Sequence, residues 1–252
     1  AFIGTSTEQV MAQFTAAIRS DATLSVPEQF IRCHLRPRTP LDIEPLIQQP
    51  RAERAQTRDA ALADATAYYA SKSPADWSAT FRAAMRQSPE RIPLKILAIT
   101  SRYTTVLRHA VAELQAAAGD LGHDLRIAME PDDHSLENPF PHLLASFKPD
   151  LVVQISRLRY ENPFLPAKVP FLCWDQDNLA CMRTDAATQS LDALTFVAGH
   201  GALQGWSCLN WPRKNVIFCH PAAATHRYAA TPAPARLLEN YACDISFISN
   251  AS

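Results

Sequence analysis

Leu94-Lys95-Ile96-Leu97-Ala98-Ile99-Thr100 is the stretch that decides the fold. It is a short apolar run rich in branched side chains, it follows Pro93, and polar residues come after it. Such a run predicts a strand that is buried on both faces, which is typical of parallel sheets. We therefore expect Leu94–Thr100 to be the central strand of such a sheet, with Ile96 and Leu97 both nearly buried.

Strand and helix patterns alternate from this segment onward. An amphipathic helix pattern follows it directly, and further strand patterns lie at 123–129, 151–155, 169–174, 193–198 and 215–219. Strands that alternate with helices predict a parallel sheet joined by right-handed crossovers. The predicted fold class is therefore α/β, with a Rossmann-like domain over residues 93–230.

The residues before this domain have helical patterns. Residues 25–50 hold five prolines and are expected to form only short helices and turns. Residues 51–72 are alanine-rich and free of proline, which favours a helix, and Ser73-Pro74 offers an N-cap and a first-turn proline for another. We expect residues 1–92 to be an all-helical module docked on the sheet domain.

Charge and cysteine content exclude several classes of protein. The chain has 252 residues, with 24 Lys and Arg against 25 Asp and Glu, so it has no long-range attraction for nucleic acid or acidic membranes. No apolar run approaches the roughly 18 residues of a membrane span. The six cysteines include no C-x-x-C pair, which predicts six reduced thiols in a cytoplasmic protein and no metal site.

Ligands of open α/β sheets bind beyond the carboxyl ends of the strands, so the loops there are the candidate sites. Ser101-Arg102-Tyr103-Thr104 follows the first strand, and its hydroxyls beside an arginine at a helix start suit an anion or a sugar. The same residues fit plain N-capping equally well. The chain has six glycines and lacks both G-x-G-x-x-G and G-x-x-x-x-G-K-[ST], which disfavours a dinucleotide or P-loop site.

An acidic pair and a histidine follow the fourth and sixth strand patterns. Asp175 and Asp177 form a D-x-D turn, which fits metal–nucleotide binding or, alternatively, a turn capped by its own side chains. His220 comes directly after the sixth strand pattern and either lines the same cleft or caps the strand.

Another histidine follows the fifth strand pattern, between two glycines. Gly199 and Gly201 would let the backbone approach a ligand closely, and His200 would offer an imidazole as a base. The alternative is a strand-to-helix turn with an exposed histidine.

Three segments carry a family resemblance. Phe196-Val-Ala-Gly199, Asn215-Val-Ile-Phe-Cys-His-Pro-Ala-Ala223 and Tyr241-Ala-Cys-Asp-Ile-Ser-Phe-Ile-Ser-Asn250 resemble, in order and spacing, the middle of CgeB-type (spore-maturation-like) glycosyltransferases. Trp174-Asp175 also looks like the acidic turn of that family. The resemblance covers about residues 94–252, and it departs from the family pattern at Ser249, where a glycine is common.

The resemblance implies a GT-B architecture, in which two Rossmann-like domains face each other across a cleft. It implies a nucleotide-sugar donor, a hydroxyl-bearing acceptor, no metal and no other cofactor, with the acceptor held by the N-terminal domain. Residues 231–252 would be a linker and the first strand of a second domain, so we expect this polypeptide to be the N-terminal part of a longer enzyme and inactive by itself.

Roles for individual residues follow from the resemblance together with their place after strands. The general base of an inverting enzyme would be His200, with Asp175 and then His220 as the next choices. The residues expected to bind substrate are Ser101, Arg102, Tyr103, Asp177, Gly199 and Gly201. The rival hypothesis is a non-catalytic Rossmann-like module that binds a small ligand or a protein partner.

Overall fold

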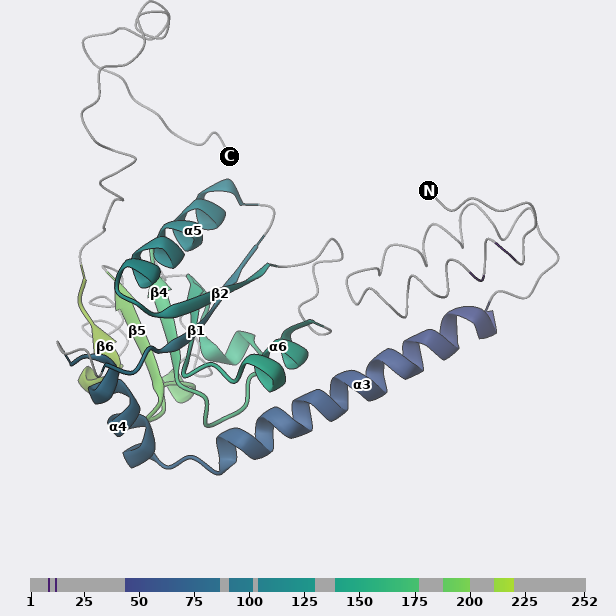
Figure 1. The fold of residues 1–252 in the computed structure, drawn as a ribbon, viewed down its shortest axis with the longest axis horizontal. Helices are drawn as coiled ribbons and strands as arrows, with labels where there is room; N and C mark the ends of the chain where they lie inside the picture. Colours follow the sequence, from purple (N-terminus) through teal and green to yellow (C-terminus); the bar gives the residue numbers. More distant parts are fainter. Residues whose placement is uncertain are drawn as a thin grey trace, which may run out of the picture. The chain divides into compact units, whose positions relative to one another are not determined.

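The computed structural model describes residues 44–86, 91–101, 104–129, 139–176, 188–199 and 211–219, together with Gln9 and Ala12. All of them belong to the first of the two units into which the chain divides, Ala1–Pro221. The described helices are α3 (Glu44–Ala70), α4 (Pro74–Ala84), α5 (Thr105–Asp120) and α6 (Pro139–Phe147), with short 3-10 turns η3 (Arg159–Glu161) and η5 (Arg213–Asn215). The strands are β1 (Lys95–Thr100), β2 (Asp124–Met129), β3 (Leu151–Ile155), β4 (Phe171–Asp175), β5 (Thr195–Gly199) and β6 (Val216–Ile217) (Figure 1).

The six strands form one sheet in the order β2-β1-β3-β4-β5-β6, and every neighbouring pair is parallel. The α/β, Rossmann-like fold class predicted from the sequence is thus confirmed. The chain runs from β1 to β2 on one side and then returns to β3 on the other side of β1. The strand order therefore reverses between β1 and β3, which makes this place the topological switch point of the sheet.

The burial predicted for β1 is also confirmed. Leu97 is fully buried and Ile96 is 9% exposed, because each lies in a hydrophobic cluster on its own face of the sheet. Its position differs from the prediction in one respect. β1 lies second from the edge of the sheet, and β3 and β4 occupy the middle.

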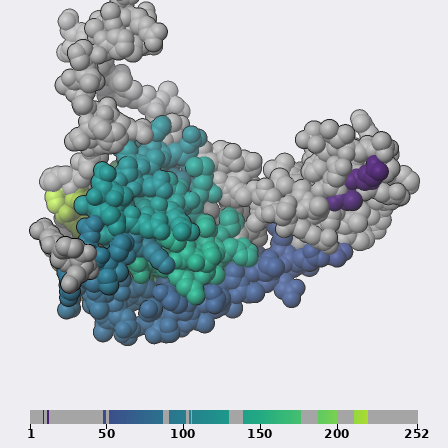
Figure 2. All heavy atoms as spheres, in the orientation of Figure 1, coloured from purple at the N-terminus to yellow at the C-terminus, as the bar shows by residue number. Residues whose placement is uncertain are grey.

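Helices cover both faces of the sheet. Ile96 and Ala98 of β1 share a buried cluster with Val111 and Ala118 of α5. Leu97 and Ile99 point to the other face, where the cluster is completed by the following residues of α3, α4 and α6: Ala65, Tyr69, Trp77, Phe140, Leu144 and Phe147. Figure 2 shows the green spheres of α6 lying directly against the blue spheres of α3, with which α6 is in contact. Residues of α3 and α4 therefore belong to the core of the second face, and Ala84 of α4 also packs in the cluster of the first face.

Helix α3 begins earlier than the sequence predicts. The prolines of residues 25–50 led us to expect only short helices and turns there, yet α3 starts at Glu44 and includes Pro45 and Pro50. A proline in the first turn costs nothing, because that N–H has no partner inside a helix. Pro50 removes one backbone hydrogen bond, but the alanine-rich sequence after it continues the helix.

Helix α4 begins as the sequence predicts. Ser73 Oγ accepts a hydrogen bond from Asp76 N at 3.2 Å, and Asp76 Oδ2 accepts one from Ser73 N at 2.7 Å. These two bonds make a capping box, and Pro74 occupies the first turn. The hydrogen bonds from Ser73 hold the pKa of the Asp76 carboxyl below its ordinary value.

Two polar contacts fix the entry into the sheet. The hydroxyl of Tyr69, which is fully buried at the end of α3, donates to the Pro149 carbonyl at 2.8 Å. Burial raises the pKa of Tyr69, so this hydroxyl remains a donor. Next to it, Asp150 Oδ2 accepts from Lys95 N at 2.8 Å and joins the starts of β1 and β3.

The predicted linker and second-domain strand, residues 231–252, lie outside the described residues. So do residues 25–43 of the proline-rich stretch and the loops that hold residues 102–103, 177–187, 200–210 and 220–230.

Candidate functional site

A pocket lies at the switch point of the sheet, between the carboxyl ends of β1 and β3. It has a volume of about 150 Å³. Its lining consists of three residues at the end of β1, two at the start of α5 and three at the end of β3: Ile99, Thr100, Ser101, Thr104, Leu107, Gln154, Ile155 and Arg157. Open α/β sheets bind ligands at this place.

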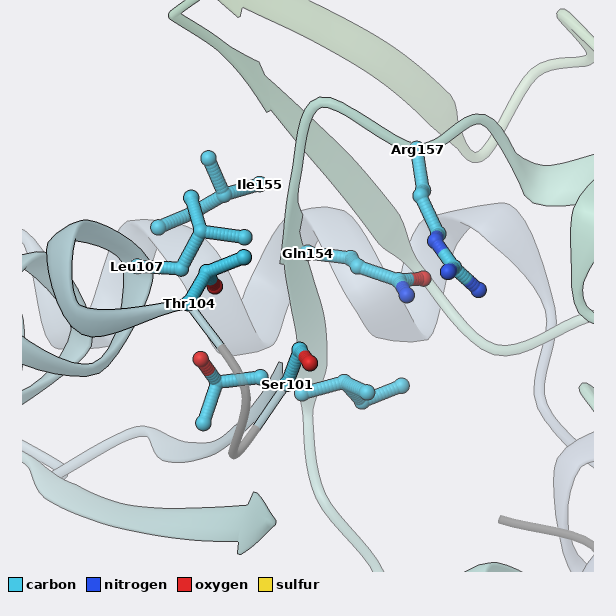
Figure 3. Close-up of a pocket in the computed structure, with 8 residues that line it drawn as sticks. Ser101, Thr104, Leu107, Gln154, Ile155 and Arg157 are labelled. Atoms are coloured by element: carbon cyan, nitrogen blue, oxygen red, sulfur yellow. The ribbon is translucent and has the colours of Figure 1, made fainter. Parts of the chain in front are cut away.

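Figure 3 shows how the labelled side chains divide. Thr104, Leu107 and Ile155 lie together at one side, and Gln154 and Arg157 extend toward each other at the other side. This division follows from strand geometry, because successive side chains of a strand point to opposite faces of the sheet. The pocket thus straddles the edge of the sheet, with an α5 side and a Gln154 side.

The α5 side holds two hydroxyl groups. Thr100 is 4% exposed, and within the described part of the chain its Oγ1 has no hydrogen-bond partner. Thr104 is the N-cap residue of α5, and its side chain makes no capping bond to the described first turn. Both residues line the pocket, so each brings a hydroxyl without such a bond to its wall.

The opposite side holds an amide and a guanidinium. Gln154 is 5% exposed, and its Oε1 accepts a hydrogen bond from Asn162 Nδ2 at 2.7 Å. This bond fixes the amide so that its N–H groups are the part left for a ligand. Arg157 is exposed and is the charged member of the lining.

The turn between Gln154 and Arg157 has an unusual backbone. Ser156 has a φ of 49°, in the left-handed backbone region that residues other than glycine rarely adopt. Two hydrogen bonds to the end of β4 hold it there: Ser156 N donates to the Trp174 carbonyl at 3.0 Å, and Ser156 Oγ accepts from Gln176 N at 3.3 Å. This turn sets the direction in which Arg157 leaves the sheet.

The acidic candidate lies further along the same edge. Asp175 is the last residue of β4, pairs in register with Gly199 of β5 and is 2% exposed. Gly199 has a φ of 138°, and a Cβ there would overlap the carbonyl of Asp175. The glycine is therefore required by the close approach of two strand ends, whether or not a ligand approaches it as well.

Three of the residues singled out from the sequence can thus be placed. Ser101 lines the pocket, and Asp175 and Gly199 end β4 and β5 at the same edge of the sheet. Because β3 lies between β1 and β4, Ser101 and Asp175 are separated by two strand spacings, about 10 Å. The other candidates lie outside the described residues: Arg102, Tyr103, Asp177, His200, Gly201 and His220.

The sequence-based prediction missed three polar members of the pocket: Thr100, Gln154 and Arg157. The sequence predicts the third strand, but no motif marks its carboxyl end as a site. Gln154 carried a signal, because a lone polar residue in the apolar run Leu151–Ile155 must either find a partner or face a ligand.

Two further groups near this edge are structural. Burial, with the Asp175 carboxyl adding to it, raises the pKa of the Cys173 thiol, which keeps that cysteine protonated and unreactive. Arg159 is 8% exposed, and its guanidinium donates to the carbonyls of Pro166, Ala167 and Val169 at 2.7–3.0 Å. It holds the loop that leads into β4.

No group of three or more histidine, cysteine or acidic side chains that could hold a metal ion occurs within the described ranges. In the same ranges, none of the helices combines the length and the apolar character that crossing a bilayer requires. No family model matches the chain, and neither a curated protein nor a solved structure matches it at a significant level.

Proposed function

We propose that this chain forms the N-terminal, acceptor-side part of a nucleotide-sugar-dependent glycosyltransferase of GT-B type. The observation that carries the proposal is the pocket at the β1/β3 switch point, which lies at the carboxyl edge, holds several polar side chains and includes Ser101. The reaction class rests on the resemblance of residues 94–252 to CgeB-type enzymes. The Rossmann-like sheet is the architecture that such an N-terminal domain requires.

The size of the pocket supports a division of labour. Sites that enclose a whole small molecule usually measure about 300–1,000 Å³, and this pocket measures about 150 Å³. It therefore suits one part of a ligand whose remainder is held elsewhere. In the proposal, a second Rossmann-like domain grips the nucleotide sugar and this domain positions the acceptor hydroxyl.

His200 is the proposed base, since it follows β5 at the edge of the sheet that carries the pocket. It would take the proton of the acceptor hydroxyl as that oxygen attacks the sugar. In a protein that carries both domains, His200→Ala should lower the turnover rate by about 10²–10⁴-fold. His142→Ala, at an exposed position on α6, is the matched control and should leave the rate unchanged.

Binding to residues 1–252 tests the division of labour directly. Calorimetry should show no micromolar affinity for nucleotide sugars, because half of an open cleft makes few enclosing contacts. Micromolar binding of a nucleotide sugar to this chain, or full activity of the His200→Ala enzyme, would contradict the proposal.

One observation favours the second candidate, a non-catalytic binding module. Asp175, the next choice as base, is 2% exposed, so its carboxylate is not accessible to an acceptor in this structure. If ligands bind at Ser101 and Gln154 and no nucleotide sugar is ever consumed, the binding module is the better description.

A further inference from the structure

We propose that the pocket at the β1/β3 switch point binds a phosphoryl group of a larger ligand. The inference deepens the proposed function, on whose pocket it rests, by naming the chemical class that the pocket takes. Its first support is Thr100, which lines the pocket, is 4% exposed and has an Oγ1 without a hydrogen-bond partner in the described ranges. Buried hydroxyls almost always have a partner, so an unsatisfied one on a residue that lines a pocket points to a ligand atom that completes it when the site is filled.

The start of α5 supplies the second support. This helix is 16 residues long, has no acidic residue in its first turn, and begins at Thr104, whose side chain makes no capping bond to that described turn. The first N–H groups of a helix lack partners within the helix, and its dipole favours negative charge at this end. Thr100 and Thr104 line the same pocket, so two hydroxyls and the helix start converge on one place.

The opposite side of the pocket also offers donors. The N–H groups of Gln154 remain for a ligand because Asn162 occupies its Oε1, and Arg157 adds a guanidinium at the rim (Figure 3). The lining therefore combines amide, hydroxyl and guanidinium donors with one positive charge, and the described lining includes no carboxylate. A phosphoryl group, with several acceptor oxygens and negative charge, matches such a set.

The volume limits how much of the ligand can enter. About 150 Å³ corresponds to roughly five water molecules at liquid density. This volume can hold a phosphoryl group with a few surrounding water molecules, but it cannot hold a nucleotide or a disaccharide. The rest of the ligand must lie beyond the edge of the sheet.

Titration of residues 1–252 with inorganic phosphate, at constant ionic strength set by chloride, tests the inference. Amide resonances of Thr100, Ser101 and Gln154 should shift with phosphate and not with chloride. Thr100→Val keeps the shape of the side chain and removes the hydroxyl, so it should weaken phosphate binding about fivefold. Arg157→Gln should weaken it about tenfold, and more at low salt.

Lys214→Gln is the matched control. Lys214 is exposed in η5, directly before β6, which is the outermost strand on the side of the sheet away from β1. It removes the same charge and should leave phosphate binding unchanged. The amide spectrum of each variant reports whether the fold is intact. Phosphate shifts no larger than those of chloride, or equal weakening by Lys214→Gln and Arg157→Gln, would overturn the inference.

Three further probes separate the source of the phosphoryl group and separate this inference from the proposed function. Displacement of phosphate by UDP indicates a donor phosphate, and displacement by glucose 6-phosphate indicates a phosphorylated acceptor. Methyl glucoside binding at these residues without phosphate binding would overturn the phosphoryl assignment and leave the acceptor site standing. Specific phosphate binding by a two-domain protein that transfers no sugar would uphold the phosphoryl assignment and remove the glycosyltransferase proposal.

Discussion

The backbone carbonyl of Asp175 occupies the space that a side chain at Gly199 would need. Gly199 also has a φ of 138°, which side chains disfavour, so Gly199→Ala should lower the free energy of unfolding by about 3 kcal/mol. Gly119→Ala is the control, because it sits in α5 with open space around its Cα and should stabilise by about 0.5–1 kcal/mol. Urea unfolding of both variants measures the difference, and a stable Gly199→Ala protein would show that the two strand ends can separate.

The unpartnered hydroxyl of Thr100 should carry a cost in stability. Thr100→Val removes it without changing the volume, so we expect a gain of about 1 kcal/mol in the free energy of unfolding. Thr195→Val tests the opposite case, since the buried hydroxyl of Thr195 donates to Asp192 Oδ1 at 2.9 Å and its loss should destabilise by about 1 kcal/mol or more. A loss of stability in Thr100→Val would mean that the hydroxyl has a protein partner.

His123 should make stability depend on pH. Its Nδ1 accepts a hydrogen bond from Leu94 N at 3.2 Å, and burial, with Arg91 adding to it, lowers its pKa. As the pH falls below about 6.5, the unfolded chain binds a proton that the folded chain does not, so stability decreases through this window. His123→Ala should cost about 1 kcal/mol at pH 8 and abolish this part of the pH dependence. Urea midpoints from pH 8 to pH 5 provide the measurement.

Asp150 should show the opposite pH dependence. Burial raises its pKa despite the hydrogen bond from Lys95 N, so the folded state keeps a proton that the unfolded state has released. Stability therefore falls as the pH rises from the ordinary value of about 4 through the raised pKa. Asp150→Asn retains an acceptor for Lys95 N and should unfold at a higher urea concentration than the wild type at pH 7, with the two converging near pH 3.

The cysteines give a simple test of covalent state. Cys173 and Cys219 are free thiols in the structure, and the sequence predicts that all six are. Thiol labelling of the denatured, unreduced protein should count six. Under native conditions Cys173 should react only as fast as the protein unfolds, because it is buried and its pKa is raised. A lower count in the denatured protein would reveal a disulfide or a modified cysteine.

Most of the sheet could be predicted because its strands are buried on both faces. Short apolar runs such as Leu151–Ile155 can bury their side chains only as strands inside such a sheet. The strand bounds predicted from the sequence therefore agree with those of the structure to within about two residues. The order of the strands could not be predicted, since alternating strands and helices fit several parallel orders. The start of α3 was missed because a local proline rule was applied to Pro45 and Pro50, where position in the helix decides the cost.

The site was predicted only in part, for a related reason. Ser101 was found because it follows a strong strand pattern, but which second strand end adjoins it depends on the strand order. Once β3 is known to be the neighbour of β1, Gln154 and Arg157 are identified as residues that line the same pocket as Ser101. The requirement for glycine at 199 depends on its register with Asp175, which no local pattern encodes.

The hydrogen bond from Tyr69 to Pro149 joins residues 80 positions apart. During synthesis α3 leaves the ribosome long before β3 exists. Some 80 further residues must be added before the Tyr69 hydroxyl can donate to the Pro149 carbonyl. Contacts of such long sequence separation slow folding, because the chain between them must be ordered first. At about 5–20 residues per second, the wait is roughly 4–16 seconds, during which the apolar face of α3 and α4 is open to other partners. The residues of α3 and α4 that form the core of one face of the sheet are thus exposed, and depend on cellular protection, while translation continues.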